Sequence, residues 1–271
     1  MPETAELADF YEEGYSQDPT SAARASRWRA LGAMGKADHV IALCAAAGLA
    51  PQRTLEVGCG DGALLCELHR RGFGGRLAGV EIAPAAVAIA RARGEIERVE
   101  IYDGRLLPAR DGEFELGILS HVLEHVHDPA ALLAETARAC RAVVVEVPLE
   151  DNLSARRAAK RAHAAEVGHL HRLSRAAARR IVHDAGLRTV GATGPEMRGA
   201  DGPRMTGAAG LRIAGELEDA LPLEVHRFLA SSASAATVKW ALRAGPHRLA
   251  PGLARRLFTV HYACLCLPRQ P

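Results

Sequence analysis

The chain has 271 residues, of which 48% are hydrophobic, and its formal net charge is +2. This length suits one α/β domain with added elements, and so small a net charge gives no sign of general nucleic-acid binding. The six cysteines form no C-x-x-C pair and lack metal-ligand spacing, so we expect a cytoplasmic protein with reduced thiols and no metal site. Because no signal-peptide pattern and no apolar run near 18 residues is present, no membrane association is expected.

The first 48 residues predict a helical cap. An acidic, tyrosine-rich lead-in over residues 1–19 precedes two expected helices, over 20–31 and 36–47, and Gly48 is the stop signal for the second. We expect Trp28 and the tyrosines to pack this cap onto the core. The alternative is that the cap closes over a ligand and that one tyrosine lines the pocket.

Strands and helices alternate four times between residues 53 and 147. The strands are expected over 53–57, 77–82, 99–102, 114–119 and 142–147, and the helices over 63–71, 84–92 and 129–139. The run 142–147 is rich in valine, which is typical of a central strand buried on both faces. This alternation predicts a mostly parallel sheet with helices on both faces and a ligand at the carboxyl ends of the strands.

The second half of the chain is less regular. We expect a basic helix over 153–167, a connector over 168–172, a helix that Ser174 begins and Gly186 ends, and a strand over 187–190. A loop over 194–206 and a helical pattern from about 208 to 256, broken near Pro222, Gly245 and Pro251, come before a last strand over 257–267. The predicted units are a cap (1–48), a ligand-binding core (49–193), a loop and helical insert that serves as a substrate lid (194–256), and the last strand (257–271).

A glycine turn follows the first strand. Gly58 and Gly60 lack a Cβ, so the backbone there can take a positive φ and approach a ligand closely. The next helix points its free N–H groups back at this turn. The spacing Gly58-x-Gly60-x-x-Ala63 fits the dinucleotide fingerprint, with Glu81 near the position of the acid that holds ribose hydroxyls. The turn alone therefore leaves NAD and other adenosine ligands open.

Three neighbouring features favour a ligand other than NAD. Glu56 lies two residues before Gly58, where a carboxylate would repel a pyrophosphate but suit a ligand with an ammonium group. Asp103 ends the third strand and could accept a hydrogen bond from an adenine amino group. The fourth strand leads directly into a histidine-rich segment, 120–127.

With these features the chain resembles the class I S-adenosylmethionine-dependent methyltransferases, in particular the group with an LE-H segment after the fourth strand. The matching stretches are 55–62, 79–82, 103–104, 120–129, 168–174 and 185–187, within residues 50 to 193. The resemblance implies a Rossmann-like α/β fold whose last strand is antiparallel, with S-adenosyl-L-methionine as cofactor. It places Gly58 and Gly60 under the methionine part of the cofactor, with Glu56 near its amino group. It also implies ribose contacts for Glu81, adenine contacts for Ile82, Asp103 and Gly104, and a place for the Ser120 backbone near the amino end.

Several histidines are candidates for acceptor chemistry. An oxygen acceptor needs a base, and His121 is expected in that role first because it directly follows the fourth strand. Its alternative is a helix-start histidine bonded to backbone. His169 or His171 could orient the substrate, whereas His125 is expected to pack and His127 to lie on the surface.

The acceptor is expected to be a small molecule, methylated at O or N, with C as the lesser option. An acidic acceptor is an open alternative, because six basic residues could meet a carboxylate or phosphate. They are Arg156, Arg157, Lys160, Arg161, Arg198 and Arg204. No aromatic platform alternates with basic residues, which disfavours RNA or DNA. A monomer or homodimer is expected, and an NAD-dependent oxidoreductase and a catalytically silent partner subunit are the alternatives.

Overall fold

A computed structural model describes residues 9, 12, 14, 15, 19–192, 211–219, 223–229 and 232–268 of the chain. The expected roles of Arg198 and Arg204 fall outside these residues. None of the described helices has the length and apolarity needed to cross a lipid bilayer.

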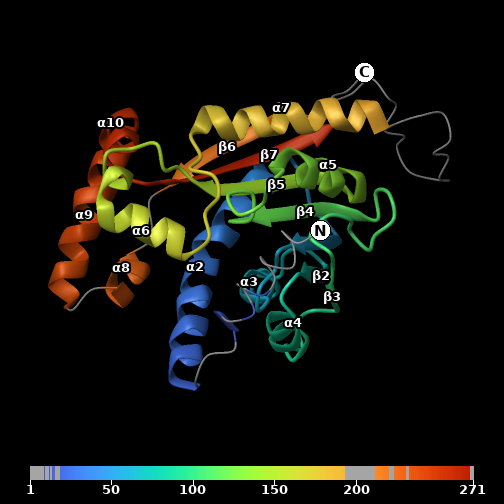
Figure 1. The fold of residues 1–271 in the computed structure, drawn as a ribbon, viewed down its shortest axis with the longest axis horizontal. Helices are drawn as coiled ribbons and strands as arrows, with labels where there is room; N and C mark the ends of the chain where they lie inside the picture. The colour runs from blue at the N-terminus through green and yellow to red at the C-terminus, as the bar shows by residue number, and fades with distance from the viewer. Residues whose placement is uncertain are drawn as a thin grey trace.

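One seven-stranded sheet forms the centre of the molecule (Figure 1). Its strands are β1 (Arg53–Val57), β2 (Arg76–Glu81), β3 (Arg98–Ile101), β4 (Phe114–Ser120), β5 (Cys140–Pro148), β6 (Leu211–Asp219) and β7 (His261–Pro268). The strand order is β3-β2-β1-β4-β5-β7-β6. The first five strands are parallel, and β7 runs antiparallel to both β5 and β6. The predicted mostly parallel sheet with an antiparallel last strand is therefore confirmed.

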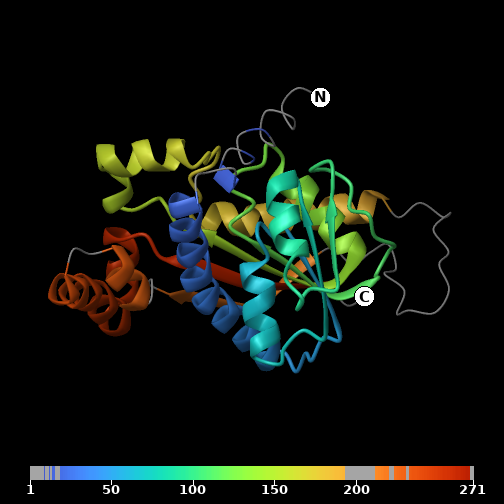
Figure 2. The same ribbon diagram turned by 90° about the horizontal axis from the view of Figure 1, so that it is seen from below.

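Helices cover both faces of the sheet, as Figure 2 shows. Helices α5 (Pro129–Ala139) and α7 (Arg175–Ala192) pack on one face, and α2 (Pro19–Ala46), α3 (Ala63–Arg70) and α4 (Pro84–Arg91) pack on the other. Along β5, Val143 and Val145 point into the first layer while Val144 points into the second. This alternation explains why β5 is apolar at nearly every position, because a strand buried on both faces needs no polar side.

The remaining helices gather at the carboxyl end of the parallel strands (Figure 1). Between β6 and β7 the chain forms α8 (Leu223–Leu229), α9 (Ala233–Leu249) and α10 (Pro251–Leu257). His261 at the start of β7 pairs with Pro148 at the end of β5, which fixes this insert at the ligand edge. After β5, a short 3-10 turn (Ser154–Arg156) and α6 (Ala158–Glu166) lie at the same end.

The prediction of two helices in the cap is wrong, because α2 is continuous over 28 residues. Gly32 and Gly35 lie between the two expected helices, and a glycine inside a helix costs only about 1 kcal/mol. Burial of Ala33, Ala37 and Val40 against the core offsets that cost.

The predictions for the second half of the chain also need correction. Residues 187–190 belong to α7 and form no strand, while 211–219, expected to be helical, form edge strand β6. Helix α9 passes through Pro246, where a break was predicted, and residues up to Leu257 are helical, so the last strand begins at His261. Local β-propensity of 187–190 was overridden because β6 supplies the strand that pairs with β7.

Candidate active site

The turn after β1 is built from glycines in the left-handed region. Gly58, Gly60 and Gly62 have φ of 71°, 53° and 76°. A Cβ on Gly58 would lie 2.7 Å from Cγ2 of Val122, and one on Gly60 would lie 2.5 Å from the hydroxyl of Tyr15. Both contacts are closer than real Cβ atoms allow, so only glycine fits this turn.

Glu81 at the end of β2 braces the same turn. Its Oε2 accepts from the Gly60 N–H at 2.8 Å, and its Oε1 accepts from Ile82 N at 2.7 Å and Ala83 N at 3.2 Å. The side chain is buried. Burial raises the pKa of Glu81 even though the three backbone donors act against that rise. The carboxylate thus lies between the glycine turn and the start of α4, at the carboxyl edge of the sheet.

Glu56 is a buried carboxyl group with an incomplete set of partners. The residue is only 4% exposed, and its Oε2 has no hydrogen-bond partner among the residues that the structure describes. Burial raises its pKa to about 8, with Lys36 acting against the rise. A buried acceptor of this kind is costly unless a donor or a cation reaches it. Glu56 is therefore suited to receive an ammonium group.

The other expected cofactor residues lie along the same edge. Asp103 is exposed, and its Oδ1 accepts from the backbone N–H groups of Arg105 and Leu106, both at 2.8 Å. Gly104 has a positive φ of 74°. Ile82 is partly buried against the core, and the Ser120 hydroxyl is buried with no partner in the described part of the chain. These residues suit the rim of an adenosine-sized site, although their roles remain predictions.

Glu12 and Tyr15, from the N-terminal part of the chain, lie at this site. The hydroxyl of Tyr15 lies over Gly60, and Cζ of Arg29 lies 4.6 Å from the centre of the Tyr15 ring. Arg29 Nε is also 3.0 Å from Oδ2 of the buried Asp61 in the glycine turn. Glu12 accepts from the N–H of Ala85 in the first turn of α4 at 2.8 Å. A tyrosine therefore reaches the expected cofactor site, as in the less favoured interpretation of the sequence, while Trp28 packs near Phe228 of α8.

His121 is the most constrained of the predicted catalytic residues. Its φ is 58°, and among the described residues it is the only one other than glycine with a positive φ. Its Nδ1 lies 3.2 Å from Oε1 of Glu124, and its Nε2 lies 3.5 Å from Oε1 of Glu146. Burial and Lys36 lower the pKa of His121, but the two carboxylates outweigh them and raise it. Both ring nitrogens therefore face carboxylates of the protein.

His169 and His171 lie in the connector after α6, which binds the segment after β4. The N–H groups of Leu170 and His171 donate to the carbonyl of Glu124 at 2.8 and 3.0 Å. His169 Nδ1 lies 3.0 Å from Oε2 of Glu150, whereas His171 Nε2 lies 2.8 Å from the carbonyl of Val126. His169 is thus paired with a carboxylate, whereas His171 contacts a backbone carbonyl of the segment after β4.

His125 packs as expected. Its Nδ1 lies 3.1 Å from the carbonyl of Gly168, and its ring meets that of His169 edge-on, with centroids 4.8 Å apart.

Sequence reasoning missed a second set of polar residues at this edge. Glu146 in β5 is fully buried, and it lies near His39 of α2 and His261 of β7 as well as His121. Lys36 and Glu150 were also assigned no role from the sequence. The only available signal was a charged residue inside the valine-rich run 142–147.

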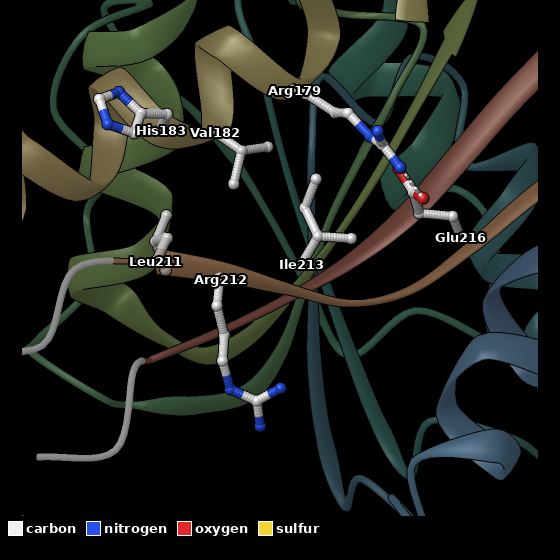
Figure 3. Close-up of a pocket in the computed structure, with 7 residues that line it drawn as sticks. All are labelled: Arg179, Val182, His183, Leu211, Arg212, Ile213 and Glu216. Atoms are coloured by element: carbon white, nitrogen blue, oxygen red, sulfur yellow. Dashed lines mark hydrogen bonds and ion pairs between the residues drawn. The ribbon is translucent and has the colours of Figure 1, made fainter. Parts of the chain in front are cut away.

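A separate hollow of about 330 Å³ lies between α7 and edge strand β6 (Figure 3). Arg179 of α7 and Glu216 of β6 form an ion pair on its wall. Its lining residues are Arg179, Val182, His183, Leu211, Arg212, Ile213 and Glu216. None of them belongs to the glycine turn or the histidine segment, so this hollow is not part of the candidate active site.

The described residues fit the cofactor that the resemblance implies. Glu56 supplies an acceptor that lacks a partner, the glycines leave room for close backbone approach, and Glu81 lies one strand away. These residues would hold the amino group, the methionine chain and the ribose in that order along the edge.

Comparisons with known proteins identify the family of the chain. A family model described as a methyltransferase domain matches residues 27–191. Ubiquinone biosynthesis O-methyltransferase of Acinetobacter baumannii (strain ACICU) is 31% identical over 105 residues, which is 36% of this chain and 42% of that relative. The chain therefore matches less than half the length of this curated relative.

Solved structures show the same fold. Magnesium protoporphyrin IX methyltransferase from Synechocystis PCC 6803 with bound SAH has a TM-score of 0.53 at 16% identity, over 97% of this chain and 94% of its own. Geranyl diphosphate C-methyltransferase from Streptomyces coelicolor A3(2) has a TM-score of 0.53 at 14% identity, over 81% of this chain and 70% of its own. Because the family model spans more than half of the chain, the protein belongs to the methyltransferase-domain family.

Proposed function

We propose that the protein methylates a small molecule at oxygen or nitrogen, with carbon as the lesser option. S-adenosylmethionine supplies the electrophilic methyl group. The observation that carries the cofactor part is the buried Oε2 of Glu56, which has no partner among the described residues and is suited to an ammonium group. The small-molecule part is supported by the Acinetobacter relative, which is named an O-methyltransferase of ubiquinone biosynthesis.

The chain's own residues would act chiefly by positioning. Methyl transfer is an in-line displacement, so holding the acceptor against the methyl group supplies much of the rate. In this proposal Glu56 fixes the amino end of the cofactor, Glu81 the ribose, and Asp103 the adenine. The glycine turn lets the backbone pass under the methionine chain.

We assign the general base to His169. A base needs one ring nitrogen that can face the acceptor, while a partner orients the other nitrogen. His169 meets this condition because Glu150 lies 3.0 Å from its Nδ1, which leaves Nε2 for the acceptor. His121 fits less well because both of its nitrogens face protein carboxylates. His171 also has one ring nitrogen engaged, but its partner is the neutral Val126 carbonyl, which stabilises a protonated ring less than a carboxylate does.

Lys36 favours an oxygen acceptor. It is half-buried on α2, and it is close enough to oppose the raised pKa of Glu56 and to lower that of His121. A cation at this position would stabilise an acceptor that develops negative charge when it loses its proton. By contrast, the basic residues of 156–161 are exposed, so they supply little recognition of an acidic acceptor.

The proposal is tested with purified protein and radiolabelled S-adenosylmethionine. Separate panels of phenols and catechols, small amines, and bulk RNA and protein would be incubated, and label transfer measured. We expect transfer to a member of the first two panels. Transfer to macromolecules alone would overturn the small-molecule assignment, and cofactor binding without turnover on any panel would favour the silent-partner alternative.

The base is tested on the best acceptor of that screen. His169→Gln should lower kcat at least about 100-fold with a smaller change in KM, as expected for a lost general base. His163→Gln is the matched control, because His163 is an exposed residue of α6. If His169→Gln kept the kcat of the control on an oxygen acceptor, the assignment of this base would be wrong.

A further inference from the structure

The geometry points to a site for one divalent transition-metal ion, held by His121, Glu146 and His261. This inference goes beyond the proposed function and can fail without it, because it concerns binding of an ion and makes no assumption about the methyl acceptor. It also differs from the sequence-based expectation of no metal site. The ligands come from the segment after β4, from β5 and from β7, so no local spacing could have indicated them.

The distances within this set fit metal ligands better than hydrogen bonds. Oε1 of Glu146 lies 3.5 Å from Nε2 of His121 and 3.5 Å from Nδ1 of His261. All three atoms lie within 4.8 Å of one another. A hydrogen bond between imidazolium and carboxylate would be about 2.7–2.9 Å. Around a tetrahedral Zn²⁺ with bonds of about 2.1 Å, neighbouring ligand atoms are about 3.4 Å apart.

The polar atoms are buried without the partners that burial demands. Both carboxylate oxygens of Glu146 and Nε2 of His121 are inaccessible to solvent and make no hydrogen bond within the described ranges. Glu146 itself has 0% exposure. Unsatisfied buried groups of this kind are rare in native proteins, and an ion is one of the explanations for them.

Neighbouring side chains supply the outer contacts that metal ligands usually have. A ligating histidine commonly donates its second ring N–H to a carboxylate, and Nδ1 of His121 lies 3.2 Å from Oε1 of Glu124. The second oxygen of Glu146 lies 3.4 Å from Nδ1 of His39. His39 in turn lies 3.7 Å from Asp219 at the end of β6. The carboxylate is thereby held from both sides.

Charge and ligand type favour a borderline ion. Two imidazole nitrogens and one carboxylate oxygen are ligands that Zn²⁺, Co²⁺ and Fe²⁺ accept, whereas Mg²⁺ prefers oxygen alone. The carboxylates of Glu124 and Glu146 lie 3.2 and 3.5 Å from the two ring nitrogens of His121, so negative charge is concentrated around this ligand. Ligation would occupy Nε2 of His121, which agrees with the assignment of the base to His169.

A second group in the same region provides the alternative. Ligand atoms of Glu124, His125 and His169 also lie within 4.8 Å of one another. The carboxylates of both groups are fully buried. In the first group one oxygen, Oε1 of Glu146, lies 3.5 Å from a nitrogen of each histidine, whereas Oε1 of Glu124 lies 3.9 Å from Nε2 of His125, so we place the ion in the first group.

The binding test uses the full chain, stripped of metal with a chelator and titrated with Zn²⁺ by calorimetry. We expect about one ion per chain, and at least tenfold weaker binding for Glu146→Gln and for His261→Gln. His163→Gln should bind as the wild type does. Absence of Zn²⁺ binding by the wild type, or loss of binding in His169→Gln with retention in His261→Gln, would overturn the proposed ligands.

A variant that should gain a new spectroscopic signal distinguishes the loss of a metal ligand from misfolding of the protein. His261→Cys substitutes a thiolate, which also ligates Zn²⁺ and Co²⁺. When loaded with Co²⁺, this variant should show a thiolate-to-cobalt charge-transfer band that the wild type lacks. If Co²⁺ binds to His261→Cys without that band, residue 261 is not a ligand and the proposed site is wrong.

Discussion

The backbone N–H of Gly60 donates a 2.8 Å hydrogen bond to Oε2 of Glu81. One carboxylate thus joins the glycine turn after β1 to the end of β2, and it is also the group expected to hold the cofactor ribose. Bracing the turn also prepares Glu81 for the ribose, because a carboxylate held by three backbone donors needs no rearrangement when the ligand binds.

Replacement of this carboxylate should therefore weaken cofactor binding strongly. We expect Glu81→Ala to raise the Kd for S-adenosylmethionine by about 10- to 100-fold, since hydrogen bonds to a charged group contribute about 1.5–3 kcal/mol. Calorimetric titration measures the effect. Glu166→Ala, an exposed acid of α6, is the control and should bind normally. Equal affinities of the two variants would remove Glu81 from the site.

The same Gly→Ala change should have opposite effects at two positions. Gly58 has a φ of 71°, and a Cβ there would lie 2.7 Å from Val122. Gly32 lies inside α2, where a Cβ would meet no atom of the described residues within 4 Å beyond its chain neighbours and the helix backbone. We expect Gly58→Ala to lower the free energy of unfolding by about 1–3 kcal/mol and Gly32→Ala to raise it by up to about 1 kcal/mol. Urea denaturation of both variants gives the comparison, and changes of the same sign would contradict it.

Cofactor binding should release a proton near neutral pH. Burial raises the pKa of Glu56 to about 8, so at pH 7 the free protein holds most of this carboxyl protonated. An ammonium group beside it stabilises the ionised form and drives the proton off. Calorimetry at pH 7 in buffers with different ionisation enthalpies should show this release, which should disappear above about pH 9. Glu56→Gln should abolish it, and a release that persists in this variant must come from another group.

Acid should weaken the contact between α7 and β6. Arg179, together with Tyr262 and Arg175, lowers the pKa of Glu216 from its usual value to about 2. A lowered pKa means that the stabilisation is present above the unfolded value of about 4.5 and is lost as the pH falls towards 2. Glu216→Gln should therefore flatten the dependence of the unfolding free energy on pH between about 5 and 2. If Glu216→Gln left the decline of the unfolding free energy below pH 5 unchanged, these ion pairs would contribute little to stability.

The grouping of the expected cofactor residues at one edge of the sheet was predictable because its signals are local. Glu56, Gly58 and Gly60 lie within five residues, and Glu81 and Asp103 end consecutive strands. A turn and the strands on each side of it bring such residues together without any long-range information.

The acceptor side was less predictable because it is assembled from distant parts of the chain. Glu146 lies in a run whose valines predict a buried strand, and its partners His39 and His261 are more than 200 residues apart in sequence. Pairing of β5 with β7 brings His261 to this edge. Even the direction of β7 follows from the family resemblance and not from its composition.

Helix α2 contacts both sides of the active site with one rigid element. Arg29 in the first half of the helix pairs with Asp61 in the glycine turn, and His39 in its second half faces Glu146. Ten residues of helix separate these contacts by about 15 Å along the axis, and one inserted residue would rotate everything beyond it by about 100°. The number of residues between Arg29 and His39 therefore fixes the distance between the glycine turn at Asp61 and the histidine group at Glu146. An insertion or deletion in this part of α2 would displace one contact relative to the other.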